Sequence, residues 1–208
     1  MKKIIGAIVL LITVLTACKN KDAFTLEGKF ENAPNLKKVS IYKGDKQIDS
    51  AILNENGEFK FEVASPDADF YYIAAEQKTY PLIAINGDEL TFKADFSKEG
   101  AEHDLRGSDN VAKLKEFSAL SNRYGKIYVD IQKEYEKKVS ANPAIKDSLE
   151  KVLIPRFEQN MEAFTKETIA FSEKNKDNLA GFYAMSSLDH TRYQSQLIKY
   201  AKDIEGKF

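Results

Sequence analysis

The chain of 208 residues contains a single cysteine, Cys18, which is its first candidate for chemistry. Lys2 and Lys3 precede an apolar run from Ile4 to Ala17 that ends next to this cysteine. As a helix the run would span about 21 Å, which is short of the ~30 Å core of a bilayer. A positive start, a short apolar stretch and small residues at its end are typical of an export signal that is later removed. Residues 1–17 are therefore predicted to be a signal peptide.

Leu15, Thr16 and Ala17, followed by Cys18, match the bacterial lipobox, in which an apolar residue and two small residues precede an obligatory cysteine. This resemblance implies recognition of these three residues by a signal peptidase, a thioether-linked diacylglycerol on Cys18, and acylation of its amine, for example with palmitate. One acyl chain holds a membrane weakly, whereas two or more hold it firmly. We expect Cys18 to be a lipid anchor and residues 18–22 its tether. The alternative is a secreted soluble protein with an incidental cysteine.

The predicted location is the cell envelope, with the lipid on Cys18 in a membrane. Lys19, Asn20, Lys21 and Asp22 lack the acidic run that marks surface export in some lipoproteins. We therefore expect a protein that faces the periplasm.

Charge and thiol content narrow the class of protein further. Removal of the first 17 residues leaves 191, with 29 basic and 32 acidic side chains. A slight negative charge gives no electrostatic footprint for nucleic acid. With Cys18 acylated, the chain has no thiol for a disulfide, so packing must hold the fold together.

The first half of the chain, residues 23–107, alternates apolar and polar side chains with a period of two. Side chains along a strand point to opposite faces in turn, so each run predicts a strand with one buried face. The apolar members of three such runs are Phe24, Leu26, Gly28 and Phe30; Phe59, Phe61 and Val63; and Leu90, Phe92, Ala94 and Phe96. About seven or eight short strands at this spacing predict an antiparallel β-sandwich.

Glycine-containing turns separate several of these runs. Gly44, Gly57 and Gly87 stand in the segments KGDK, NENG and NGD. Asn-Gly supplies the positive φ angles that tight hairpins require, so we expect hairpins at these turns.

From Ser108 onward the apolar period becomes helical, which predicts an all-α segment over residues 108–208. Ser108 or Asp109 can cap the first helix, and Asn142-Pro143 is a start signal for the second. Pro155 lies inside the second stripe and predicts a kink or break. The expected helices cover about 109–140, 143–174, 179–188 and 191–204.

Each long stripe is apolar on one face, so the two long helices are expected to pair as a hairpin. The predicted fold class is therefore α+β, with the β-sandwich and the helical segment following one another along the chain.

The residues that usually carry catalysis do not form a recognisable site. The chain has no Cys-x-x-Cys motif, no phosphate-binding glycine loop and no Gly-x-Ser-x-Gly elbow. His103 is expected on the surface of a strand and His190 between two short helices, and neither has further ligands at metal-site spacing. A glycosidase pair cannot be selected from 32 acidic residues by spacing alone. We therefore assign no catalytic, cofactor-binding or metal-binding residue and expect no enzymatic activity.

Aromatic side chains offer a second kind of candidate site. Tyr42, Tyr71, Tyr72 and Tyr80 could form an exposed patch that binds a sugar or a protein surface. Packing is the favoured interpretation, with Tyr71 facing the helices and Phe70 and Tyr72 in the sandwich core. The absence of tryptophan weakens the sugar alternative.

The motifs FTLEGKFENAP, DSAIL with NGEFKF, INGDELTF and GSDN together resemble one known domain. It is the N-terminal domain of unknown function that precedes the thioredoxin-fold domain in TlpA/ResA-like thiol–disulfide oxidoreductase lipoproteins of Gram-negative bacteria. The resemblance covers residues 24 to about 120. In those relatives a Trp-Cys-x-x-Cys-type motif carries the chemistry, and no position of this chain matches it.

Three functions remain open at this stage. The first is a non-catalytic, membrane-anchored module that binds or positions an envelope protein, associated with thiol–disulfide redox proteins. The second is a truncated oxidoreductase whose thioredoxin domain is missing. The third, with less support, is a lipoprotein that binds surface glycans or peptides through the tyrosine patch.

Overall fold

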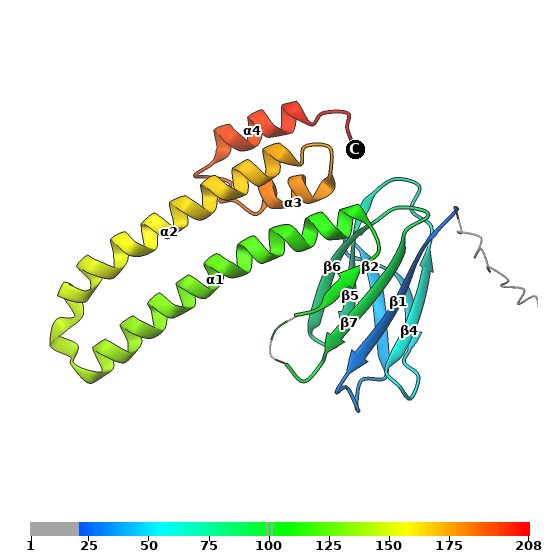
Figure 1. Cartoon of the computed structure of the whole chain (residues 1–208), viewed down its shortest axis with the longest axis horizontal. Coiled ribbons are helices and arrows are strands. Elements are labelled where there is room, and N and C mark those ends of the chain that lie inside the picture. The colour runs from blue at the N-terminus through cyan, green and yellow to red at the C-terminus, as the bar shows by residue number, and fades with distance from the viewer. Residues whose placement is uncertain (1–20, 99, 101) are drawn as a thin grey trace, which may run out of the picture.

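The computed structural model describes residues 21–98, 100 and 102–208. Eight strands in two sheets come first, and four α-helices follow (Figure 1), which confirms the α+β fold class. The strands are β1 (Phe24–Glu31), β2 (Lys38–Lys43), β3 (Lys46–Ile52), β4 (Glu58–Val63), β5 (Asp69–Ala75), β6 (Lys78–Ala84), β7 (Glu89–Asp95) and β8 (Asp104–Arg106). The helices are α1 (Asp109–Ala141), α2 (Lys146–Lys174), α3 (Leu179–Ser186) and α4 (Gln194–Asp203).

Two four-stranded sheets enclose the main core, with the orders β4-β1-β7-β8 and β3-β2-β5-β6. The alternating residues of β1, β4 and β7 point inward as expected, and Leu26, Phe61 and Leu90 are almost fully buried. The second sheet contributes Ile41, Ile73 and Leu82 to the same core. Because the sheets bury only one face of β1, β4 and β7, the other faces of these strands carry charged side chains.

Strand pairing departs from the expectation in two respects. β1 pairs antiparallel with β4 but parallel with β7, so the sandwich is not wholly antiparallel. The turns at Gly57 and Gly87 have positive φ angles of 77° and 88°, yet they join strands of different sheets. Among the three turns, only the one at Gly44 closes a hairpin, between β2 and β3. Alternation defines which face of a strand is buried, whereas it does not define the neighbouring strand.

The junction between the sandwich and the first helix is short. Only Gly107 and Ser108 separate β8 from α1, and the Ser108 hydroxyl accepts a hydrogen bond from Val111 N. A Cβ atom on Gly107, where φ is 123°, would lie 2.0 Å from the Glu89 carbonyl oxygen. Glycine is therefore required at this position, because its backbone touches that of β7.

The two long helices form the expected hairpin, and residues 142–145 make its tip. Asn142 caps the short 3₁₀ turn Pro143–Ile145 by accepting a hydrogen bond from Ala144 N. α2 continues through Pro155 without a break, so the helix is not divided there. At 33 residues, α1 is about 50 Å long and extends well away from the sandwich (Figure 1).

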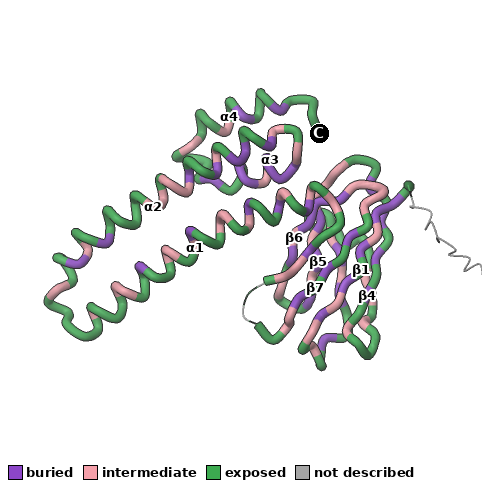
Figure 2. The backbone as a smooth tube through the Cα atoms, viewed as in Figure 1, coloured by how far each residue is buried: buried purple, intermediate pink, exposed green. Residues whose placement is uncertain are grey.

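The helices dock on the outer face of the β5–β6 pair. Ile83 of β6 is fully buried against Leu114 and Phe117 of α1, and Phe70 of β5 packs at the edge of the same cluster. α3 covers this cluster with Leu179, Ala180 and Ala184. Figure 2 shows the buried positions concentrated in the sandwich and around α3, whereas the hairpin near its tip is mostly exposed. The two sheet faces of β5 and β6 are thus both covered.

We predict opposite effects for alanine at two glycines. A Cβ atom on Gly28 would lie 2.1 Å from Cζ of Phe59, whose ring is held by Phe30, Phe61 and Phe92. Gly28→Ala should therefore lower the free energy of unfolding by about 1–3 kcal/mol. Gly125→Ala, inside α1 with open space around it, should raise the free energy of unfolding by about 0.5–1 kcal/mol. Urea denaturation of both variants measures the two effects, and equal stabilities would contradict the prediction.

The dependence of folding stability on acidic pH should report on one ion pair between the sandwich and α1. Lys115 Nζ lies 2.7 Å from Asp104 Oδ1 and, together with Arg106, holds the pKa of Asp104 below its usual range. Because the folded pKa is lower than the unfolded value of ~3.9, this contribution to stability is present above that value. It is lost as the pH falls from about 5 through the folded pKa.

Asp104→Asn should therefore be less stable than the parent chain at pH 7, and the difference should narrow as the pH falls below about 4. Denaturant unfolding at several pH values measures this difference. Asp45→Asn, in the exposed β2–β3 turn, is the matched control. A difference that stays constant down to acidic pH would count against the assignment.

Candidate functional site

The predicted lipid-attachment residue Cys18, together with Leu15, Thr16 and Ala17, lies outside the described residues. Within the described residues, no helix is long and apolar enough to cross a membrane. The other candidate residues lie in the sandwich and the helices.

Two of the four candidate tyrosines are buried, which agrees with the packing interpretation and counts against the alternative of an exposed patch. Tyr71 and Tyr80 are each 1% exposed and belong to the sandwich core. The Tyr71 hydroxyl donates to Ser65 Oγ at 2.8 Å, and its ring packs edge-on to Phe24. Tyr71 faces the core rather than the helices, because Tyr71, Ile73 and Ala75 form the inner face of β5.

Phe70 accordingly faces the helices and lies beside the rings of Phe182 and Tyr183. Tyr42 and Tyr72 are half-buried and stand opposite each other where β2 pairs with β5. The Tyr42 hydroxyl lies 3.1 Å from Gln47 Oε1. The structure thus brings together two of the four tyrosines on a sheet surface and places the other two in the core.

The histidines do not form a metal site. His103 is half-buried rather than on the surface, with its ring stacked on Phe92 and edge-on to Tyr80. His190 is exposed, and its Nε2 lies 3.0 Å from the Ser186 carbonyl oxygen. The described residues contain no group of three or more His, Cys, Asp or Glu side chains placed to hold a metal ion.

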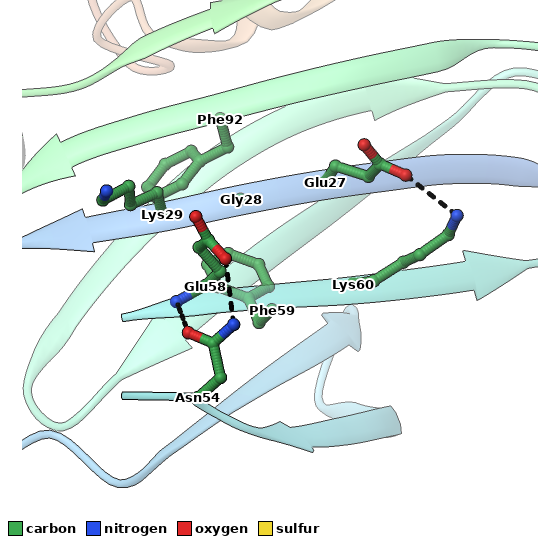
Figure 3. A pocket seen from close by; sticks show the side chains of 8 residues that line it. All are labelled: Glu27, Gly28, Lys29, Asn54, Glu58, Phe59, Lys60 and Phe92. Carbon is green, nitrogen blue, oxygen red and sulfur yellow. Dashed lines mark hydrogen bonds and ion pairs between the residues drawn. The ribbon is translucent and has the colours of Figure 1, made fainter. Parts of the chain in front are cut away.

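A cavity of about 620 Å³ lies over β1 and β4, and half of its lining residues are charged, namely Glu27, Lys29, Glu58 and Lys60 (Figure 3). Lys60 Nζ lies 2.9 Å from Glu27 Oε1, and this contact raises the pKa of Lys60. On the other side, Asn54 Nδ2 donates to Glu58 Oε2 at 2.9 Å. The first contact is an ion pair and the second joins a carboxylate to a neutral amide, as on a solvated sheet face. The lining of this cavity therefore does not single out a nucleophile or a general acid or base.

A second cavity of about 390 Å³ lies between α1 and α2 near the tip, and we refer to it as the distal groove. It is lined by Tyr128, Ile131, Gln132 and Tyr135 of α1 and by Glu150, Leu153, Ile154 and Phe157 of α2. Most of these side chains are apolar, although Ile154 is 51% and Phe157 40% exposed. Large apolar side chains exposed together on one surface are typical of an interaction site.

Buried residues make the floor of the distal groove and aromatic rings its wall. Ile131 and Leu153 are buried between the two helices, in contact with Leu149. The rings of Tyr128 and Phe157 lie 5.2 Å apart across the helix pair. The Tyr135 hydroxyl donates to Glu150 Oε1 at 2.8 Å, and this bond raises the pKa of Tyr135. Each helix thus contributes four residues to the groove, and these residues face one another across the helix pair.

The hydroxyl of Tyr128 is buried and has no hydrogen-bond partner among the described residues. Burial raises the pKa of Tyr128, so this phenol stays neutral at physiological pH. An unsatisfied buried hydroxyl is uncommon in a folded protein.

The helical period of apolar residues in the sequence includes Ile131 and Tyr135 in the first stripe and Phe157 in the second, but it does not predict the groove. Its signal was present in Tyr128 and Ile154, which are apolar residues outside the two stripes. Such additions widen the apolar face of each helix beyond what one partner helix can cover.

We predict that the exposed lining of the distal groove contributes little to folding. Ile154→Ser should change the free energy of unfolding by about 0.5 kcal/mol or less, because the side chain is half exposed. Leu153→Ala, one residue away and 5% exposed, should cost about 2–5 kcal/mol. Thermal and urea unfolding of the two variants measure the contrast. Equal losses would mean that the groove residues serve packing.

The comparison with known families separates the sandwich from most of the helical hairpin. Residues 24–114 match the protein family described as "Domain of unknown function (DUF4369)". The match spans all eight strands and the first six residues of α1, and it ends before most of the hairpin. No curated protein matches the chain. The sandwich is thus similar to a domain of unknown function, as expected.

Proposed function

We propose that the protein is a non-catalytic, lipid-anchored module of the cell envelope that binds and positions a partner protein. The observation that carries this proposal is the shape of the chain. The described residues begin at the end of the long axis opposite to the hairpin tip (Figure 1). A chain anchored at its N-terminus would therefore present the distal groove away from its point of attachment.

Chain length limits how far the sandwich can lie from the anchor. Six peptide units connect Cys18 to Phe24, the first residue of β1, and span at most about 20 Å. A lipid on Cys18 would keep the sandwich close to the membrane surface. α1 adds about 50 Å of reach beyond the sandwich.

The non-catalytic part of the proposal is supported by what the candidate sites contain. The cavity of about 620 Å³ carries two carboxylates and two lysines, of which Lys60 and Glu27 form an ion pair, and the distal groove is mainly apolar. An apolar groove on a helical pair suits the recognition of another protein better than the transfer of a proton or a group. Turnover by the purified protein that is lost on substitution of a groove or cavity residue would overturn this part.

The partner proposed from the sequence resemblance is a thiol–disulfide redox protein of the periplasm. Its support is the resemblance of the sequence motifs to the front domain of redox lipoproteins, whereas the family match of residues 24–114 is to a domain of unknown function. A truncated oxidoreductase is the second candidate on the same grounds, and sequencing past codon 208 separates the two. The glycan-binding alternative loses its support, because Tyr71 and Tyr80 are in the core.

The lipid anchor is tested by Cys18→Ser in a Gram-negative host fed with an alkyne analogue of palmitate. The parent chain should be labelled and should sediment with membranes. The variant should carry no label and should retain its first 17 residues, because lipid transfer precedes cleavage at a lipobox.

Lys19→Ser, which leaves the lipobox intact, is the matched control and should be labelled like the parent. Labelling of Cys18→Ser, or a parent chain that remains unlabelled and does not sediment with membranes, would contradict the anchor.

A further inference from the structure

We propose that two copies of this chain form a symmetric dimer in which their β4 strands pair antiparallel. The sheet with the order β4-β1-β7-β8 ends at β4, so this strand is an edge to which another strand can add. The inference concerns a second copy of the chain and depends on neither the proposed lipid anchor nor the distal groove.

The other three edges of the two described sheets carry features that prevent strand addition. β8 is only three residues long. β6 contains Pro81, which has no N–H for a ladder, and α1 packs beside this residue. Where β3 pairs with β2 the register shifts, and Asp49 Oδ1 accepts a hydrogen bond from Ser50 N at 2.7 Å. Short strands, prolines and bulges are the means by which natural sheets avoid edge pairing.

β4 lacks these features. It is six residues long, contains no proline and pairs with β1 without a shift in register. Its side chains alternate strictly between the buried and the exposed face, so a second strand could continue the same alternation. Among the edges of the described sheets, β4 is therefore the one that suits strand addition.

Hydrogen bonds to β1 define which residues of β4 face outward from the sheet. Phe30 N donates to Gly57 O, and these two residues continue the register of the β1–β4 pair. In an antiparallel pair, residue pairs that exchange hydrogen bonds alternate with pairs that do not. Glu58, Lys60 and Glu62 therefore direct their backbone N–H and C=O groups away from β1.

The first of these three residues is engaged by the preceding loop. Asn54 N donates to Glu58 O at 3.0 Å, and Asn54 Oδ1 accepts from Glu58 N at 2.9 Å. An added strand would therefore pair from Lys60 onward. The pairing segment is centred on Phe61, between Lys60 and Glu62.

Charge selects one register for two copies of this segment. When Phe61 stands opposite Phe61 of the other copy, Lys60 of each copy lies opposite Glu62 of the other, and each such pair exchanges both of its N–H···O bonds. A shift to the neighbouring symmetric register would place Lys60 opposite Lys60, or Glu62 opposite Glu62. Opposite charges on facing residues stabilise an antiparallel pair, whereas like charges destabilise it. The β4 segment is thus complementary to itself in a single register.

Two further observations agree with this arrangement. Lys60 lies 2.9 Å from Glu27 of β1, yet its side chain is 57% exposed, so it can contact a second carboxylate across the edge. Figure 1 shows β4 on the side of the sandwich opposite to the helical hairpin. A two-fold axis through Phe61, perpendicular to the sheet, therefore directs the two hairpins away from each other.

The first test reverses one charge at a time in the full chain, in a detergent matched in density to the buffer. Sedimentation equilibrium of the parent chain should show a reversible dimer with a dissociation constant below about 300 µM, as expected for a small contact. Lys60→Glu places acids opposite each other, and Glu62→Lys places lysines opposite each other. Each variant should therefore associate at least about tenfold more weakly than the parent.

A mixture of the two variants shows whether these positions face each other. In the mixed dimer, two acids of the Lys60→Glu copy face two lysines of the Glu62→Lys copy, so the association should return to that of the parent. Lys93→Glu makes the same change in charge on β7, away from the edge, and should associate like the parent. Circular dichroism should be the same for all these chains, because the changed side chains are exposed.

Disulfide cross-linking tests the register. In a Cys18→Ser background, oxidation of a mixture of Lys60→Cys and Glu62→Cys chains should give covalent dimers, because Cα atoms of such facing residues lie about 5.5 Å apart. Either chain alone should give far fewer, because identical positions in the two copies are offset by two residues along the strands.

Three results would overturn the inference. The first is a parent chain that remains monomeric at about 300 µM. The second is a mixture that associates no more tightly than the single variants, or single variants that associate like the parent. The third is cross-linking of either cysteine variant alone to the same extent as the mixture.

Discussion

The direction of the helical hairpin depends on one apolar layer, where the outer face of the β5–β6 pair meets the start of α1. Ile83 has no exposed surface in this layer, and Leu114 and Phe117 close over it. α3 packs into the same layer through Leu179 and Ala184. The hydrophobic gain from burying these side chains thus fixes the sandwich, the hairpin and α3 relative to one another. The distal groove lies beyond this layer, and Ile154 and Phe157 of its lining stay exposed.

The sequence predicts a strand well when one of its faces is polar. β4 alternates without exception, and its buried and exposed residues follow the pattern. β5 carries aromatic side chains at three successive positions, so alternation alone cannot say which face meets the sandwich core. Both faces of β5 are in fact covered, and Phe70 and Tyr71 occupy the faces opposite to those expected. The parallel pairing of β1 with β7 is likewise a property of distant segments that no local pattern contains.

The two candidate sites differ in how far the sequence could reveal them. The predicted lipobox is four consecutive residues, so the lipid attachment proposed for it can be inferred before any fold is known. The distal groove needs two segments about twenty residues apart and a third helix that stops at Ser186. Neither long helix shows by itself that part of its apolar face lacks a cover. Helix bounds could be predicted because caps such as Ser108 and Asn142 are local signals.

The two-residue junction between β8 and α1 connects the hairpin to the sandwich without a flexible linker. Gly107 is pressed against the backbone of β7 and Ser108 is engaged in the helix cap, so neither residue acts as a hinge. With an arm of about 50 Å, each degree by which the sandwich tilts moves the far end by about 1 Å. A tilt of the sandwich by ten degrees would therefore displace the hairpin tip by about 9 Å.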